Sequence, residues 1–209
     1  MTGHQGKFIT VEGIEGAGKS TILRCIHHYL NNAGCNVVVT REPGGTPLAE
    51  QIRHVLLQVD VNETMTPDAE LLLMFAARSQ HIKQVIEPAL QAGQWVVSDR
   101  FVDASYAYQG GGRGMDMQFI AALDQRIVKD MKPHLTILLN VSPELGLARA
   151  KHRGPQDRIE REKVEFFTRV RDCYLRRAKA EPQRIQVVDS TQSLEVVQAQ
   201  VCALLQRVT

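Results

Sequence analysis

Residues 13–20 restrict the possible folds of this chain more than any other stretch. They read Gly-Ile-Glu-Gly-Ala-Gly-Lys-Ser and are followed by Thr21, which matches the pattern of phosphate-binding loops. The glycines let the backbone adopt positive φ and approach an anion closely, and the N–H groups at the start of the next helix favour negative charge. In such a loop Lys19 reaches the outer phosphates and the Ser20 hydroxyl coordinates Mg²⁺.

The residues on either side of this loop supply the context that it requires. Residues 7–11 are β-prone, and Ile22, Leu23, Ile26 and Leu30 have helical spacing after the loop. A strand, a loop and a helix are therefore predicted in the order that a phosphate-binding loop needs.

Four further segments are predicted to be strands because they are short, apolar and rich in β-branched residues. They are residues 36–40, 94–98, 135–141 and 184–188. The first of them is predicted to be fully buried. Helical patterns alternate with these strands, which indicates an α/β fold with a five-stranded parallel sheet flanked by helices. No repeat or linker divides the sequence, so residues 1–209 are predicted to form one domain.

Two regions between the strands have a distinctive composition. Residues 67–91 are predicted to form a long helix with proline at its first position. Its centre, residues 71–77, is apolar nearly all round, which favours burial against both the domain core and a second subunit. Residues 149–161 are basic and contain a Gly-Pro pair, which predicts a mobile segment between helices.

The overall composition argues against several classes of protein. Hydrophobic residues make up 44% of the 209 and charged residues 23%, and the net charge of +2 does not indicate nucleic-acid binding. The four cysteines lack the spacing of a zinc or redox motif. The first residues lack the apolar segment of a secretory signal, and no apolar run reaches the roughly 18 residues of a membrane span. We therefore expect a cytoplasmic protein that does not bind membranes.

Charged pairs follow two of the predicted strands. Arg41 and Glu42 come after the second strand, and Asp99 and Arg100 after the third. Parallel sheets bind ligands at the carboxyl ends of their strands, so these side chains are expected beside the phosphate loop. An arginine there suits a second phosphorylated ligand, and Asp99 suits a ligand of Mg²⁺-bound water. The chain contains no Asn-Lys-x-Asp guanine-reading sequence, which weakens a GTPase interpretation.

Several of these segments together are similar to those of the bacterial thymidylate kinases, which transfer the γ-phosphoryl group of ATP to dTMP. The segments that carry the resemblance are residues 12–21, 40–46, 75–78, 99–101, 108–114 and 157–160. Arg-Glu-Pro-Gly-Gly and Gln-Gly-Gly-Gly-Arg-Gly are specific, whereas the phosphate loop is shared by many unrelated activities. The resemblance implies the three-layer P-loop nucleoside monophosphate kinase fold, a mobile lid at about 149–161, a homodimer, and ATP with Mg²⁺ as the donor.

The resemblance also implies roles for the residues that handle phosphate. Lys19 would stabilise charge on the transferring phosphoryl group, Ser20 and Asp99 would hold Mg²⁺, and Arg100 would align the acceptor phosphate. Glu15 would accept a hydrogen bond from the 3′-hydroxyl of dTMP; a solvated loop charge is the alternative. The residues implied to bind ATP are Gly13, Ile14, Glu15, Gly16, Ala17, Gly18, Lys19, Ser20, Thr21 and Arg149.

The implied dTMP site draws on five separate segments. Its residues are Glu15, Arg41, Pro43, Phe75, Arg78, Arg100, Tyr108 and Gln109. Arg78 would donate to the thymine O4 edge, Gln109 would pair with the polar edge of the ring, and Tyr108 would lie beneath the sugar. For Arg41 a structural salt bridge is an equal alternative.

The residue that stacks on thymine is less tightly specified by the resemblance. Family members often place a phenylalanine four residues before the arginine, where this chain has Met74, whereas Phe75 lies three before Arg78. Offsets of three and four share one helix face. We favour Phe75, with Met74 as the alternative, and both could instead simply fill the core.

The loop and lid residues together indicate which cation reaches the γ-phosphate. Some thymidylate kinases carry an arginine where this chain has Gly16, and others supply the cation from the lid. The lid-arginine type fits this chain, with Arg153 as the catalytic cation, Arg149 as the contact to the ATP base and Arg158 as an alternative. A solvated helix face is the other explanation of these cations. The acceptor is an anionic phosphate oxygen, so no histidine is expected to act as a general base.

Two other functions compete with this one. The first is another small-molecule kinase of the same fold, acting on guanylate, uridylate or a deoxynucleoside; Arg78, Gln109 and the Arg-Glu-Pro-Gly-Gly turn argue against it. The second is a nucleotide-binding switch with slow hydrolysis, which the charged strand ends disfavour because they suit a second ligand.

Overall fold

Five parallel strands form the centre of the fold in the computed structural model, which describes residues 6–59, 63–151 and 156–208. The strands are β1 (Phe8–Glu12), β2 (Val37–Arg41), β3 (Trp95–Asp99), β4 (Leu135–Asn140) and β5 (Ile185–Asp189), in the sheet order β2-β3-β1-β4-β5. The predicted five-stranded parallel sheet is confirmed. Val11 and Arg41 are both in register with Asp99, so the carboxyl ends of β1, β2 and β3 meet at one edge.

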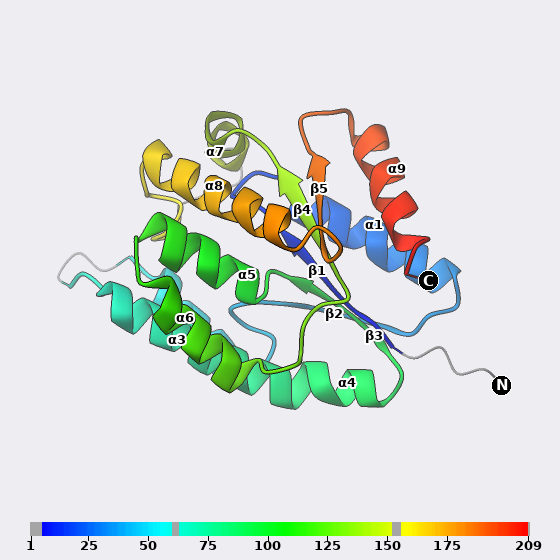
Figure 1. Ribbon diagram of the computed structural model, residues 1–209, viewed down its shortest axis with the longest axis horizontal. Helices are drawn as coiled ribbons and strands as arrows, with labels where there is room; N and C mark the ends of the chain where they lie inside the picture. Colours follow the sequence, from blue (N-terminus) through cyan, green and yellow to red (C-terminus); the bar gives the residue numbers. More distant parts are fainter. Residues whose placement is uncertain (1–5, 60–62, 152–155, 209) are drawn as a thin grey trace.

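Helices cover both faces of the sheet (Figure 1). α1 (Lys19–Asn32) packs against α9 (Leu194–Leu205) on one face, whereas α3 (Pro67–His81), α4 (Glu87–Gln91) and α8 (Val164–Ala180) lie on the other. The remaining helical segments are α2 (Pro47–Leu57), the π-helical η1 (Ile82–Ile86), α5 (Val102–Ser105), the π-helical η2 (Tyr106–Gly112), α6 (Met117–Ile127) and α7 (Pro143–Lys151). In the described part of the chain, no helix is both long enough and apolar enough to cross a membrane.

Local sequence signals explain where several helices begin. The Thr46 and Thr66 hydroxyls accept hydrogen bonds from the third residue of α2 and α3, and a proline occupies the first position of each helix. Asp116 and Ser193 cap α6 and α9 in a similar way. These caps satisfy N–H groups that have no partner within the helix.

The second strand differs from the sequence prediction. β2 was expected to be fully buried, but it is an edge strand and the Val39 side chain is 46% exposed. An apolar, β-branched run is equally compatible with an edge and a centre, because it reports strand propensity and not the number of neighbours.

The long helix predicted for residues 67–91 is present, but it is interrupted by η1, which separates α3 from α4. In α3, Leu71 and Phe75 are buried, whereas Leu72 is 50% exposed. One side of this apolar helix therefore faces the core and another side lies on the surface of the described chain. The glycine-dense segment after residue 108 is also helical, since η2 continues from α5.

Candidate active site

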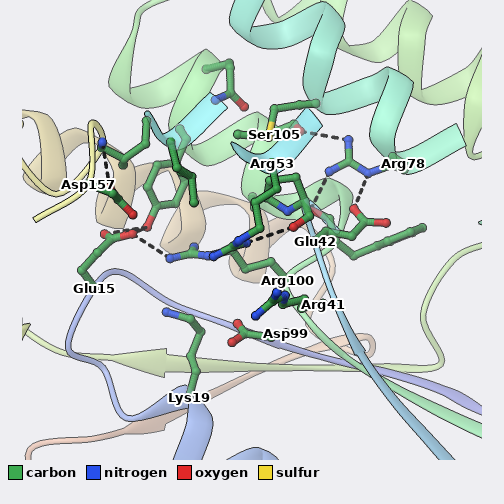
Figure 2. Close-up of a pocket in the computed structure, with 18 of the residues that line it drawn as sticks. Glu15, Lys19, Arg41, Glu42, Arg53, Arg78, Asp99, Arg100, Ser105 and Asp157 are labelled. Carbon is green, nitrogen blue, oxygen red and sulfur yellow. Dashed lines mark hydrogen bonds and ion pairs between the residues drawn. The ribbon is translucent and has the colours of Figure 1, made fainter. Parts of the chain in front are cut away.

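A cavity of about 310 Å³ lies where the carboxyl ends of β1, β2 and β3 meet. The phosphate loop forms one wall, and residues of α2, α3, η2 and the segment after α7 form the others (Figure 2). Of the predicted site residues, those that line it are Glu15, Lys19, Ser20, Arg41, Pro43, Arg78, Asp99, Arg100, Tyr108 and Gln109. The structure thus brings together residues that are separated by up to 94 positions in the sequence.

The phosphate loop has the backbone conformation that its glycines permit. Gly13, Gly16 and Gly18 have φ angles of 139°, 71° and 93°, and Gly18 precedes the first turn of α1. The Lys19 Nζ donates to the carbonyl oxygens of Gly13 and Ile14, both at 3.1 Å. Burial, followed by the positive charge of Arg100, lowers the pKa of Lys19 to about 8. Because burial disfavours the ammonium form, an anion bound at the loop would stabilise it.

Gly16 is also required by the packing of the loop against α7. A Cβ atom at Gly16 would lie 1.9 Å from the carbonyl oxygen of Gly146, and one at Gly146 would lie 2.6 Å from that of Glu15. The loop and α7 therefore approach each other through two glycines. An arginine at position 16 would require α7 to move.

Glu15 forms the centre of a buried polar cluster. Its carboxylate accepts hydrogen bonds from Arg100 Nη2 at 2.8 Å and from the Tyr108 hydroxyl at 2.8 and 2.9 Å. The Arg100 guanidinium also lies 4.7 Å from the centre of the Tyr108 ring. Burial raises the pKa of Tyr108 well above its ordinary value, so the hydroxyl remains a donor. The solvated alternative for Glu15 is wrong, because the residue is only 9% exposed.

The backbone at Arg100 is held by a second carboxylate. Arg100 has a φ of 70°, which is unusual for a residue with a side chain. Glu12 Oε1 accepts from the next peptide N–H, that of Phe101, at 2.7 Å, and Glu12 Oε2 accepts from the Tyr174 hydroxyl at 2.6 Å. Tyr174 in turn accepts from Arg100 Nη1 at 3.3 Å. Glu12 thus supports both the strained turn and the arginine side chain.

Asp99 and Ser20 provide oxygen atoms at the mouth of the phosphate loop. Both line the cavity, and Ser20 is exposed at the start of α1. Asp99 Oδ1 is buried and has no hydrogen-bond partner among the described residues. An unpaired buried carboxylate oxygen and a hydroxyl on the same cavity are oxygen donors of the kind that Mg²⁺ or its bound water requires. These residues therefore fit a magnesium ion.

Arg78 is almost completely buried and has three partners within the protein. Its Nε donates to Glu42 Oε2 at 2.7 Å, Nη1 donates to Ser105 Oγ at 3.0 Å, and Nη2 donates to the Phe101 carbonyl at 3.1 Å. The other Glu42 oxygen lies 2.8 Å from His81 Nδ1. This network holds the guanidinium rigidly at the wall of the cavity (Figure 2).

The structure corrects the residue expected to stack on the base. Phe75 is 2% exposed, belongs to the apolar core beneath the sheet and does not line the cavity. Its ring lies 4.7 Å from the Arg78 guanidinium and so supports that side chain from the core. Met74 lines the cavity instead. The preference for Phe75 is therefore wrong, and the alternative, Met74, is the residue in place to cover a bound ring.

Gln109 lines the cavity from η2 and is anchored behind it. Its Nε2 donates to Glu70 Oε1 at 2.8 Å. Glu70 is 1% exposed and also pairs with Arg113 Nη2 at 3.1 Å and with Arg158 Nη2 at 2.6 Å. Although burial disfavours the charged carboxylate, hydrogen bonds from Arg113 and Gln109 lower the pKa of Glu70.

Two arginines lie beside Pro43 at the β2 edge of the cavity. Arg41 forms an exposed ion pair with Glu50 at 2.8 Å, so the salt-bridge alternative is present, although Arg41 also lines the cavity. Arg53 Nη1 donates to the Pro43 carbonyl at 2.9 Å. Burial and then Arg41 lower the pKa of Arg53. With Lys19 and Arg100, these arginines surround one space with positive charge (Figure 2).

The structure places two of the three candidate lid cations. Arg149 Nη1 donates to the Ser190 carbonyl at 3.1 Å, in the loop after β5. Arg158 is tied to α2 and α3, because its Nε donates to the Leu56 carbonyl at 2.8 Å and its Nη2 pairs with Glu70. Arg158 is therefore occupied away from the phosphate loop. Arg153 lies outside the described residues.

Sequence reasoning did not identify several residues that shape this cavity. Arg53 and Glu42 line it, and Glu70 and Tyr174 hold the lining residues Gln109 and Arg100 in place. Arg53 falls between apolar positions of an amphipathic helix and carries no motif. Glu42 was noted as a strand-end charge, but its pairing with Arg78, 36 positions away, has no signal in the sequence.

Comparisons with known proteins identify one family to which this chain is similar. The family model for thymidylate kinase matches residues 11–201. Curated thymidylate kinases from Vesicomyosocius okutanii and Hahella chejuensis are 53% and 54% identical, covering 97% and 93% of this chain and 98% and 93% of their own lengths. The crystal structure of thymidylate kinase from Ehrlichia chaffeensis superimposes with a TM-score of 0.78 at 33% identity, covering 96% of this chain and 98% of that one. The chain belongs to the thymidylate kinase family.

Proposed function

We propose that this chain transfers the γ-phosphoryl group of ATP to dTMP, which yields dTDP and ADP. The observation that carries the proposal is a phosphate loop facing a second group of cations across one cavity. Lys19 belongs to the phosphate loop, whereas Arg41, Arg53 and Arg100 line the same cavity from β2, from α2 and from the turn after β3. A site for two phosphorylated ligands needs positive charge on both sides.

The residues of the cavity suit a reaction that depends on alignment and charge neutralisation. Burial disfavours the charged form of Lys19, and the negative charge of a bound γ-phosphate would stabilise that form. Arg100 would hold the dTMP phosphate in line, and Glu15 would accept from the 3′-hydroxyl of the sugar. Tyr108, which is fixed by Glu15, would close the space beneath the sugar. The attacking phosphate oxygen is anionic near neutral pH, so no general base is needed.

Ser20 and Asp99 would hold Mg²⁺, directly or through water. When bound, this ion neutralises charge on the ATP phosphates. The unpaired Asp99 oxygen supports this assignment, because it leaves a buried acceptor that a cation would satisfy.

Recognition of the base would involve one donor, one amide and one apolar side chain. Arg78 would donate to thymine O4, and its network with Glu42 and Ser105 keeps the guanidinium from turning away. Gln109 would pair with the polar edge of the ring, and Met74 would cover its face.

The lid at residues 149–161 would supply the remaining positive charge, with Arg153 near the γ-phosphate and Arg149 near the ATP base. Arg158 is less suited to the catalytic role, since it is held by Glu70 and Leu56. A closed lid would also exclude water as a competing acceptor.

A homodimer would bury an apolar surface formed by three helices. Leu48 and Val55 on α2, Leu72 on α3, and Met117 and Phe119 on α6 are exposed, and α3 packs against both other helices. Exposed apolar side chains on helices that pack together are typical of subunit interfaces. The cytoplasm, the expected location of dTTP synthesis, remains a prediction.

The function is tested by offering purified protein ATP and Mg²⁺ with dTMP, dUMP, dGMP or thymidine in parallel. ADP release is followed by a coupled assay, and dTDP is identified by chromatography. We expect dTMP to support the highest kcat/KM. Faster turnover of dGMP or thymidine would favour another small-molecule kinase, and tight nucleotide binding without acceptor-dependent turnover would favour a switch protein.

A further inference from the structure

The buried carboxylate of Glu70 has no place in the proposed reaction, yet it contacts a residue of the base site. It lies on α3, behind the cavity wall, and is 1% exposed. Gln109 Nε2 lies 2.8 Å from Glu70 Oε1, while Arg113 and Arg158 approach Glu70 Oε2 at 3.1 and 2.6 Å. Glu70 is thus a negative charge that faces two guanidinium groups and one amide.

The chemistry of these groups determines which way the Gln109 amide points. Hydrogen bonds from Arg113 and Gln109, together with the nearby arginines, keep Glu70 ionised. An ionised carboxylate only accepts hydrogen bonds, whereas a carboxamide has one donating and one accepting end. A reversed Gln109 would place its amide oxygen against the Glu70 oxygen with no proton between them. The amide nitrogen must therefore face Glu70, and the amide oxygen is the acceptor left for a ligand in the cavity.

We propose that Glu70 is a specificity-determining positioning residue, which orients the Gln109 amide so that the cavity presents an acceptor beside the Arg78 donor. This proposal rests on the proposed function and extends it to the choice of pyrimidine. Thymine offers an acceptor at O4 and a donor at N3–H, which matches a donor and an acceptor in the wall. Cytosine offers a donor at its 4-amino group and an acceptor at N3, so both pairs would be mismatched.

The expected discrimination comes from buried groups that the wrong base would leave unpaired. Arg78 and Gln109 are 2% and 1% exposed, so water cannot readily replace a lost partner. For this reason, a site that hydrogen-bonds one arrangement of donors and acceptors has a much lower kcat/KM for a ligand with the inverse arrangement. Without Glu70, the amide could turn over and accommodate cytosine by donating to N3.

The central test is Glu70→Gln, because a glutamine at position 70 can either accept from or donate to Gln109. The measured quantity is the ratio of kcat/KM for dTMP to kcat/KM for dCMP. We expect this ratio to fall at least roughly tenfold. A lid or folding defect would lower both rates together and leave the ratio unchanged. The matched control is Glu162→Gln, which removes the other carboxylate paired with Arg113 but does not contact Gln109; the ratio should hold.

A double-mutant cycle tests whether Glu70 changes the dTMP to dCMP ratio through the Gln109 amide. In a Gln109→Met background, Glu70→Gln should change the dTMP to dCMP ratio no further, because Glu70 acts through the amide. If Glu70→Gln does not fold, Glu70→Asp keeps the charge for the arginines but withdraws the carboxylate from Gln109, and the same fall is expected. An unchanged ratio in the folded variant, or an equal fall in Glu162→Gln, would overturn the proposal. Wild-type protein that leaves dTMP unphosphorylated would instead refute the proposed function.

Discussion

At the scale of single residues, the site depends on carboxylates that hold other side chains. Glu12 supports the turn at Arg100, Glu15 holds Arg100 and Tyr108, and Glu42 holds Arg78. Each pair is buried, so the arginine keeps one orientation and less conformational entropy is lost when a ligand binds. The charged groups that would contact the substrates are thus positioned before the substrates arrive.

Glu12 should make the stability of the protein depend on pH. Burial, reinforced by the negative charge of Asp103, raises the pKa of Glu12 from 4.5 to about 7. The folded state therefore binds this proton more tightly than the unfolded state does. The resulting contribution to the free energy of unfolding is fully present below pH 4.5 and is lost as the pH rises through about 7. We predict that Glu12→Gln gains stability relative to wild type between pH 5 and pH 8, by about 2 kcal/mol.

Urea unfolding at the two pH values measures this difference. The matched control is Glu87→Gln, which removes a carboxylate that forms a surface pair with Lys83; its stability relative to wild type should change little between pH 5 and pH 8. If the difference in unfolding free energy between Glu12→Gln and wild type were the same at both pH values, the raised pKa of Glu12 would be contradicted.

Arg153 is the lid residue predicted to act in catalysis. An arginine that neutralises charge in a phosphoryl-transfer transition state contributes roughly 10³–10⁵ in rate in the best-studied systems. We predict that Arg153→Ala lowers kcat at least roughly tenfold while the Kd for dTMP stays within error. Steady-state kinetics and equilibrium dTMP binding provide both values. Unchanged turnover would show that Arg153 does not have this role.

At the scale of secondary-structure elements, close contact between the phosphate loop and α7 shapes the donor side. Gly16 and Gly146 meet there, and Gly146 lies inside α7 with no room for a Cβ atom. Alanine in a helix interior is ordinarily more favourable than glycine by roughly 1 kcal/mol. The tertiary contact should reverse this preference, because the glycine lies against the backbone of Glu15.

We therefore predict that Gly146→Ala lowers the Tm and weakens ATP binding at least about threefold, because α7 must move away from the loop. Thermal unfolding and ATP titration of the same preparation measure both effects. The control is Ala148→Ser, at an exposed position of the same helix. A variant that is as stable as wild type and binds ATP equally well would show that the loop and α7 can separate without cost.

At the scale of the whole molecule, the apolar surface on α2, α3 and α6 is predicted to join two copies of the chain. Leu72 is 50% exposed within this surface, whereas Leu194, on α9, is 48% exposed outside it. Leu72→Arg should place an uncompensated charge in the interface and shift a dimer to a monomer of 23.4 kDa. Leu194→Arg is the matched control and should remain dimeric.

Sedimentation velocity distinguishes these species. A wild-type chain that sediments as a monomer would refute the dimer. If Leu72→Arg and Leu194→Arg both stay dimeric, the interface lies elsewhere on the molecule.

Much of the architecture followed from the sequence because its signals are local. The phosphate loop, the helix caps and the strand–helix alternation each depend on residues that are close in the chain, and the structure contains all five predicted strands. The meeting of Asp99 and Arg41 beside the loop was also predictable, since parallel strands end at one edge. By itself, the sequence therefore determined the fold class and which segments gather at the cavity.

Only the tertiary structure decided which side chains of those segments face the ligands. Met74 and Phe75 are adjacent, and their order in the chain does not reveal that the first lines the cavity and the second enters the core. Glu70 and Gln109 are 39 positions apart, and no periodicity connects them. The reason is physical: the rotation of a helix about its axis is set by how its side chains pack against the sheet and neighbouring helices, and that packing exists only once distant segments have come together.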